Sequence, residues 1–177
     1  MNNQQDTLID TENPNPEGTR PRALNILLIL SAVYIVMSFS ATLQAIMGGP
    51  LTQVQLETET ADFYGSISEL RDQGIGQEFT DMAETMIETS FYINNEVFYL
   101  YNTLRLMELL IGAISIVLMF QLKKVGFHIY IVYSLLPIIT TYITLPQELI
   151  LTASIIVLVL IAALFALLYG SKLKYMK

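Results

Sequence analysis

The chain of 177 residues has no cysteine and only one histidine, His128. Without cysteine, disulfides, thiolate metal ligands and thiol redox chemistry are all excluded. A transition-metal site usually takes several histidine or cysteine ligands, and a single histidine does not provide them. We therefore expect neither a metal nor a cofactor, and we interpret His128 as a residue at the end of a hydrophobic segment.

Catalytic and nucleic-acid-binding signatures are also missing. The sequence has no phosphate-binding glycine loop, no nucleophile elbow and no HExxH zinc motif. Its 9 lysine and arginine residues are too few and too scattered for a nucleic-acid-binding surface. These absences predict a non-enzymatic protein that does not bind nucleic acid.

Long hydrophobic runs are what the sequence has in abundance. Hydrophobic residues make up 53% of the chain and its mean hydropathy is +0.52, which is too apolar for an ordinary soluble domain. A helix needs about 20 apolar residues to cross a bilayer. Four runs have about that length: Leu24–Met47, Phe98–Leu122, Val125–Leu145 and Leu149–Tyr169. We predict an all-α, multi-pass membrane protein whose core is a four-helix transmembrane bundle in the lipid bilayer.

Composition divides the chain into a short tail and one membrane domain. Residues 1–22 are polar and carry several prolines, which predicts a disordered cytoplasmic tail. Residues 23–177 then form a single membrane domain, with 48–97 as an acidic extracytoplasmic segment between the first two spans. The first run is too long, and begins too late, for a cleaved signal peptide, so we expect it to remain as a span.

The basic residues predict how the spans are oriented. Seven of the nine lie near span ends that would face the same side of a four-span protein. Because basic residues are retained on the cytoplasmic side, both termini and the turn between the second and third spans are expected in the cytoplasm. This is the arrangement expected in the cytoplasmic membrane of a bacterium. The seven residues are Arg20, Arg22, Lys123, Lys124, Lys172, Lys174 and Lys177.

The segment 48–97 is predicted to form two extracytoplasmic helices, which we call the outer helices. Thr52 can cap the first helix, whose apolar stripe is Leu56, Phe63, Ile67 and Leu70. Gly74 and Gly76 break this helix, and a second begins near Gln77. Its apolar stripe is predicted to be buried and consists of Phe79, Met82, Ala83, Met86, Ser90, Ile93 and Val97.

The second outer helix also carries a stripe of acidic residues at helical spacing: Glu78, Asp81, Glu84 and Glu88. One interpretation is a solvated face that keeps the helical hairpin away from anionic lipid. The other is an electrostatic docking face for a basic partner, or a weak surface for divalent cations. The stripe lacks the glycine-centred calcium-loop pattern.

Arg105 and Glu108 are the only charges well inside a hydrophobic run. They are three residues apart, so they are neighbours on a helix. Charges at this depth cost about 2.5–3.5 kcal/mol each and usually face protein or water. If one helix ran unbroken from the outer segment into the second span, Glu108 would continue its apolar face. Three interpretations of the pair are open: a structural ion pair, joined by Asn102, Gln44 or a tyrosine, a proton or cation site centred on Glu108, or a contact to a span of a partner subunit.

Three further features concern helix packing. Pro137 lies near the middle of the third span and predicts a kink, which either aids packing or acts as a hinge. Gly126 is expected to take a positive φ in the preceding turn, and Thr144 to cap the fourth span. Small residues at four-residue spacing predict close helix contacts, within the chain or in a homo-oligomer. These sets are Ala41, Ala45 and Gly49, and Ala162, Ala166 and Gly170.

The segment Lys123-Lys124-Val125-Gly126-Phe127-His128-Ile129-Tyr130 combines a basic turn, a glycine and an aromatic entry into a span. In this layout the chain resembles small bacterial four-span membrane proteins of unassigned function, a resemblance that implies no activity. Our first hypothesis is an interaction or accessory subunit that binds a membrane or extracytoplasmic protein through its acidic hairpin. The alternative is a small transporter or channel subunit that moves protons or cations past Glu108.

Overall fold

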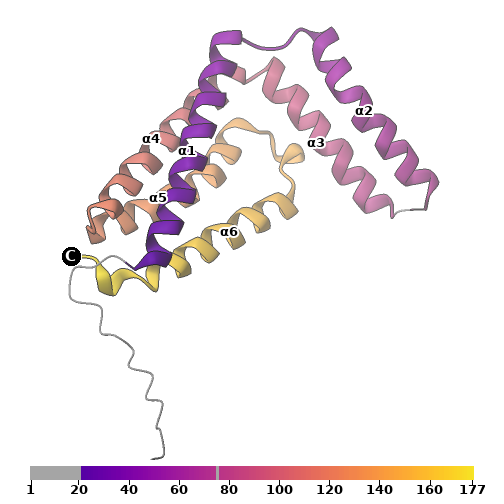
Figure 1. The fold of residues 1–177 in the computed structure, drawn as a ribbon. Coiled ribbons are helices and arrows are strands. Elements are labelled where there is room, and N and C mark those ends of the chain that lie inside the picture. The colour runs from indigo at the N-terminus through magenta and orange to yellow at the C-terminus, as the bar shows by residue number, and fades with distance from the viewer. Residues whose placement is uncertain (1–20, 75) are drawn as a thin grey trace, which may run out of the picture.

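The computed structural model describes residues 21–74 and 76–177, and these residues form helices without any strand. The predicted tail at residues 1–22 lies almost entirely outside the described residues. Six α-helices and two short 3-10 helices follow one another (Figure 1). Their bounds are α1 Arg22–Gly48, α2 Gln53–Asp72, α3 Gln77–Asn95, α4 Phe98–Phe120, α5 Lys124–Thr144, η1 Gln147–Leu149, α6 Thr152–Gly170 and η2 Leu173–Tyr175.

Four of these helices, α1, α4, α5 and α6, are long and apolar enough to cross a membrane, which confirms the predicted all-α class. The fourth begins at Thr152, three residues later than its hydrophobic run. Pro146 precedes the short helix η1, and Ile150 and Leu151 are extended. The predicted cap was wrong, because the Thr144 hydroxyl donates to the Thr140 carbonyl of its own helix at 2.8 Å.

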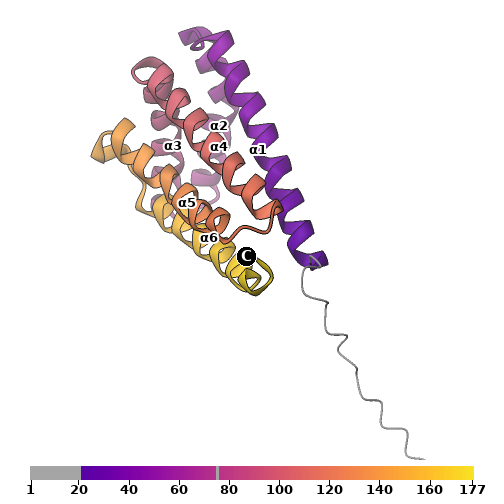
Figure 2. The ribbon, with the colours of Figure 1, turned by 90° about the vertical axis from the view of Figure 1, so that its left-hand side faces the viewer.

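The helix α4 lies at the centre of the bundle. It packs most extensively against α5, while α1 lies against α4 and α6 lies against α5 (Figures 1 and 2). The buried core runs along the interfaces between these helices. Its fully buried members are Leu24 and Leu28 of α1, Leu109 and Met119 of α4, and Tyr169 of α6.

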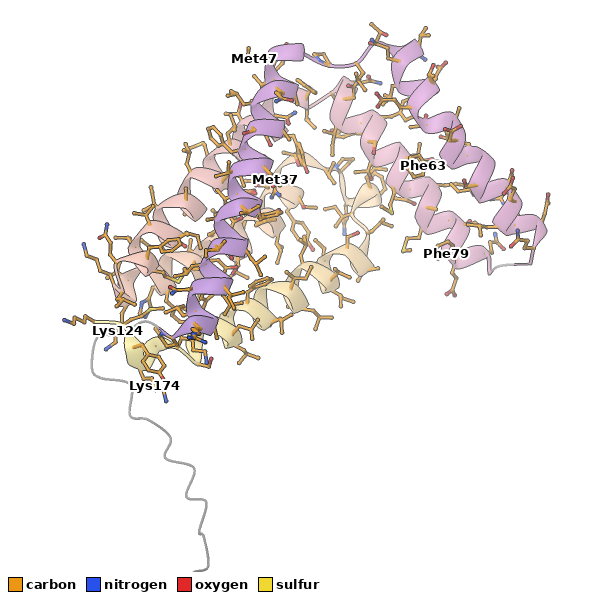
Figure 3. All side chains as sticks on the ribbon, in the orientation of Figure 1. Met37, Met47, Phe63, Phe79, Lys124 and Lys174 are labelled. Atoms are coloured by element: carbon orange, nitrogen blue, oxygen red, sulfur yellow. The ribbon has the colours of Figure 1, made fainter. Side chains whose placement is uncertain are left out.

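The start of α1, the α4–α5 turn and the C-terminus lie at the same end of the bundle, where Figure 3 shows Lys124 and Lys174. Hydrogen bonds tie the chain end to the turn, from Lys177 N to the Leu122 carbonyl and from Lys124 N to the Lys177 carbonyl. The positive φ in this turn belongs to Leu122, at 57°, and not to Gly126 as predicted. Gly126 lies instead in α5, pressed against the backbone of Met119.

The helices α2 and α3 pack against each other beside the bundle, close to the far end of α1 (Figure 1). Thr52 caps α2 through a capping box with Gln55, and α3 begins at Gln77, as predicted. The face that α3 buries was predicted wrongly. Its buried residues are Thr80, Ile87 and Asn94, at seven-residue spacing, and those of α2 are Leu56, Thr60 and Ile67.

Large apolar side chains on this helix pair are therefore left exposed. Phe63 of α2 is 65% exposed, and Phe79 and Met86 of α3 are also exposed (Figure 3). The backbone leaves the helix at Glu96 and Val97, so α3 and α4 are separate helices. An unbroken helix therefore does not carry the apolar face of α3 into α4.

Candidate functional site

Arg105 and Glu108 form an ion pair inside the bundle, as their spacing predicted. Arg105 Nη1 donates to Glu108 Oε2 at 3.0 Å, and the Glu108 side chain is only 3% exposed. The other carboxylate oxygen, Oε1, accepts a hydrogen bond from the Thr140 hydroxyl of α5. Arg105 Nη2 donates to the Tyr34 hydroxyl of α1 at 2.8 Å. One charged pair thus links α1, α4 and α5.

The partners of this pair differ in part from those considered from the sequence. A tyrosine does join it, but Asn102 donates to the Phe98 carbonyl of its own helix at 2.8 Å. Thr140 of α5, which was not among the partners considered, donates to Glu108. Thr140 was not predicted as a hydrogen-bond partner of Glu108, because the register between α4 and α5 has no signature in the residues next to either position.

A cavity of about 380 Å³ lies beside this network. Residues from all four long helices line it, and Arg105 is the one charged side chain among them. Its other polar groups are hydroxyls, including those of Tyr34, Tyr133 and Ser134. The apolar part of the lining consists of Leu30, Ile35, Pro137, Leu158, Ile161, Ala162 and Phe165. Ser31 and Tyr130 also line the cavity.

Tyrosines pack together where α1, α5 and α6 meet, and two of them, Tyr130 and Tyr133, line the cavity. The Tyr169 hydroxyl donates to the Leu27 carbonyl at 2.9 Å and lies 2.8 Å from the Ser31 hydroxyl, which must then donate to it. The Tyr130 ring packs edge-on against Tyr169 and Tyr133, with centroid distances of 4.8 and 5.7 Å. These contacts join α1 to α6 near the start of α1.

Pro137, the predicted hinge, lies within α5 and forms part of the cavity wall. The Thr141 hydroxyl donates to the Pro137 carbonyl of the same helix at 2.8 Å. Its role as a hinge stays a prediction.

The predicted acidic stripe is only partly a free surface. Glu78, Asp81 and Glu88 are exposed on α3. Glu84 instead pairs with Arg71 of α2, whose Nη2 donates to Glu84 Oε1 at 2.7 Å. This exposed pair joins the two outer helices, and exposed pairs of this kind contribute about 0–1 kcal/mol.

An open groove of about 390 Å³ lies where α3 meets α2 and η1. Two carboxylates, Glu88 and Glu96, and an amide, Asn95, provide its polar groups. The rest of its lining is three aromatic rings and a leucine, contributed by Tyr64, Phe91, Tyr92 and Leu149. Carboxylates next to aromatic faces suit a cation, because both attract positive charge. Only Glu88 of the predicted stripe belongs to this groove.

Asn94 fixes this end of α3 to the connection between α1 and α2. Its side-chain oxygen accepts from Leu51 N at 2.8 Å, and its amide nitrogen donates to the Leu51 carbonyl at 2.9 Å. The Thr89 hydroxyl adds a longer contact of 3.3 Å to the Leu149 carbonyl, beside η1. These contacts attach α3 to Leu51 on one side and to Leu149, a residue of the groove, on the other.

We expect Asn94→Ala to loosen this attachment without unfolding the bundle. Leu51 would lose a partner for both of its backbone groups, which costs about 1–3 kcal/mol. Hydrogen exchange measured by mass spectrometry should then be at least about fivefold faster around Leu51. Ser90→Ala is the matched control and should change exchange little, because the exposed Ser90 hydroxyl bonds the Met86 carbonyl of its own helix. Equal exchange in the two variants would contradict the anchoring role.

No group of histidine, cysteine or acidic residues able to hold a metal occurs within residues 21–74 and 76–177. His128 is exposed, and its Nδ1 lies 3.0 Å from the Lys124 carbonyl. Comparison of the chain with protein-family models, curated proteins and solved structures finds no match in any of the three.

Proposed function

We propose that this protein is a non-enzymatic membrane protein and an interaction or accessory subunit, whose outer helices bind a basic segment of a partner protein. The groove lined by Glu88, Glu96 and three aromatic rings carries this proposal. A lysine or arginine side chain fits such a site, because its charge meets the carboxylates and its stem meets the rings.

The surroundings of the groove favour an extended basic segment over a single small cation. Glu78 and Asp81 are exposed further along α3. Residues 48–97 contain ten acidic residues and one basic residue, Arg71, which already pairs with Glu84. Such an excess of one charge attracts a basic partner over distances near the Debye length of about 8 Å.

In this proposal α1, α4, α5 and α6 cross the lipid bilayer of a bacterial cytoplasmic membrane. The basic residues at one end, including Lys123, Lys124 and Lys174, favour a cytoplasmic position for that end. Helices α2 and α3 then form an extracytoplasmic hairpin. Among residues 21–74 and 76–177, the segments at the opposite end are the short α4–α5 turn and the residues after α6, so the hairpin is the larger described surface for a partner.

The absence of cysteine permits a direct test. In intact cells, Asp81→Cys would be labelled with a membrane-impermeant, thiol-reactive photo-crosslinker. We expect a discrete crosslinked product with a second protein, whereas Lys174→Cys at the opposite end should stay unlabelled. Adding Glu88→Lys and Glu96→Lys should reduce the product at least about tenfold, because like charges would face the partner.

The matched control adds Glu59→Lys and Asp62→Lys, which change the same charge on the exposed surface of α2 outside the groove. This control should retain most of the product. The proposal fails if no crosslinked protein forms, or if both double reversals reduce the product equally. Labelling of Lys174→Cys from outside would instead contradict the orientation.

Proton or cation translocation past Glu108 is the alternative, and the geometry supports it less. A translocating carboxylate needs access to water, yet Glu108 is nearly fully buried. Both of its oxygens accept hydrogen bonds, from Arg105 and Thr140. The cavity beside it is lined by Arg105 and not by Glu108. These contacts suit a structural ion pair.

A further inference from the structure

The cavity between the four long helices opens to the side of the bundle. At its rim, Leu30, Tyr34 and Ile161 are each about half exposed or more, at 60%, 51% and 49%. These residues belong to α1 and α6, which lie close together near the C-terminus and diverge toward the start of α6 (Figure 1). For helices that cross a bilayer, such an opening faces lipid, so only lipid-soluble molecules would enter.

The shape and lining of the cavity fit a long apolar chain. Its volume of about 380 Å³ lies within the usual range for ligand pockets, about 300–1,000 Å³. Leu158 and Phe165 both line it and lie about 10 Å apart along α6. The cavity therefore extends along α6 far enough for an extended apolar chain.

The charge in the lining determines which polar head group a bound molecule would carry. Arg105 is the one charged residue in the lining, and its side chain is 26% exposed. Its bonds to Glu108 and Tyr34 occupy two of its five N–H groups. Glu108 lies behind the wall, so the cavity meets the cationic guanidinium and not the carboxylate.

We propose that this cavity binds an anionic amphiphile, a long apolar chain that ends in a carboxylate, which enters from the bilayer between α1 and α6. The carboxylate accepts hydrogen bonds from Arg105, and the chain packs along Leu158, Ala162 and Phe165. The site lies inside the bundle, apart from the groove on the outer helices, and does not depend on the proposed partner.

The chain contains no tryptophan, so a single introduced tryptophan reports on the cavity alone. Leu158→Trp places it in the lining, and Leu160→Trp places it on the lipid-facing side of the same helix, where Leu160 is 63% exposed. In phosphatidylcholine vesicles, dibromostearic acid should quench the first reporter in a saturable manner. The second reporter should show only a quenching proportional to the amount of acid in the bilayer.

Filling the cavity should remove the saturable part. In the Leu158→Trp protein, we expect this result for Ala162→Phe, because Ala162 is buried in the lining. Ala163→Phe adds the same volume at an exposed position and should leave the quenching unchanged. Ser134→Leu fills the cavity from α5, so the test does not depend on the folding of a single variant.

The proposed interaction between the carboxylate of the bound molecule and Arg105 is tested separately. Arg105→Gln combined with Glu108→Gln removes both charges together, and should raise the half-saturating amount of acid at least about tenfold. The methyl ester of the same acid should also bind at least about tenfold more weakly. Equal binding of acid and ester would overturn the assignment of an anionic head. Linear quenching at both reporters, or saturable quenching that survives both Ala162→Phe and Ser134→Leu in folded protein, would overturn the site itself.

Discussion

Replacing Arg105 with leucine is expected to lower the free energy of unfolding by about 3–5 kcal/mol, the usual effect of breaking a buried ion pair. The variant leaves the Glu108 carboxylate, which is 3% exposed, without its counter-charge. Glu108→Leu should cost less, because Arg105 is 26% exposed and keeps its bond to Tyr34. The long arginine side chain can also turn toward the membrane surface.

The double variant with leucine at both positions decides whether the pair is structural. It removes both charges, and the Thr140 hydroxyl can turn to the carbonyl of its own helix. We therefore expect it to recover most of the stability lost in Arg105→Leu. Unfolding in mixed micelles of mild and denaturing detergent, followed by circular dichroism, measures all three variants. If Arg105→Leu unfolds like the parent protein, the ion pair does not hold the bundle together.

The second large effect is expected at Gly126, where α5 leaves the α4–α5 turn. A Cβ atom there would lie 2.7 Å from the Met119 backbone nitrogen and 2.9 Å from the Leu118 Cβ. Backbone atoms cannot yield as a flexible side chain can. Gly126→Ala should therefore destabilise the protein by about 1–3 kcal/mol, and Gly126→Val by more, because α4 and α5 must move apart.

Two other glycines provide matched controls for this prediction. Gly65 in α2 has nothing within 4 Å of an added Cβ, so Gly65→Ala should stabilise its helix by about 0.5–1 kcal/mol. Gly170 meets the Phe127 ring at an ordinary 3.6 Å, so Gly170→Ala should be nearly neutral. The same detergent unfolding measures all the glycine variants. A Gly126→Ala protein as stable as Gly170→Ala would show that the two helices can adjust at the turn.

Some of the site was predictable because its determinants are local. Arg105 and Glu108 are three residues apart, so any helix brings them together. The capping role of Thr52 and the break before Gln77 likewise follow from residues within a few positions. Tyr34 and Thr140 were not predictable as specific partners, because they reach the pair from two other helices. Their places depend on how α1 and α5 are rotated and shifted against α4.

In the outer helices, too, some features were predictable from the sequence and others were not. Their apolar stripes gave the right helices but the wrong buried face for α3, where Thr80, Ile87 and Asn94 are buried and Phe79 and Met86 are exposed. Periodicity assigns one apolar face to a helix, on the assumption that this face packs on its own protein. Here the buried residues of α2 and α3 are two threonines and an asparagine beside three apolar residues, so packing geometry outweighs hydropathy.

The order, length and helical character of the four apolar segments were encoded in the amino-acid sequence alone. An apolar run of about 20 residues has few stable structures in a bilayer other than a helix, because every backbone group must be paired internally. The cavity and the groove have no such local signature. They arise where α1 diverges from α6 and where α3 crosses η1, and these placements result from contacts between residues far apart in the chain.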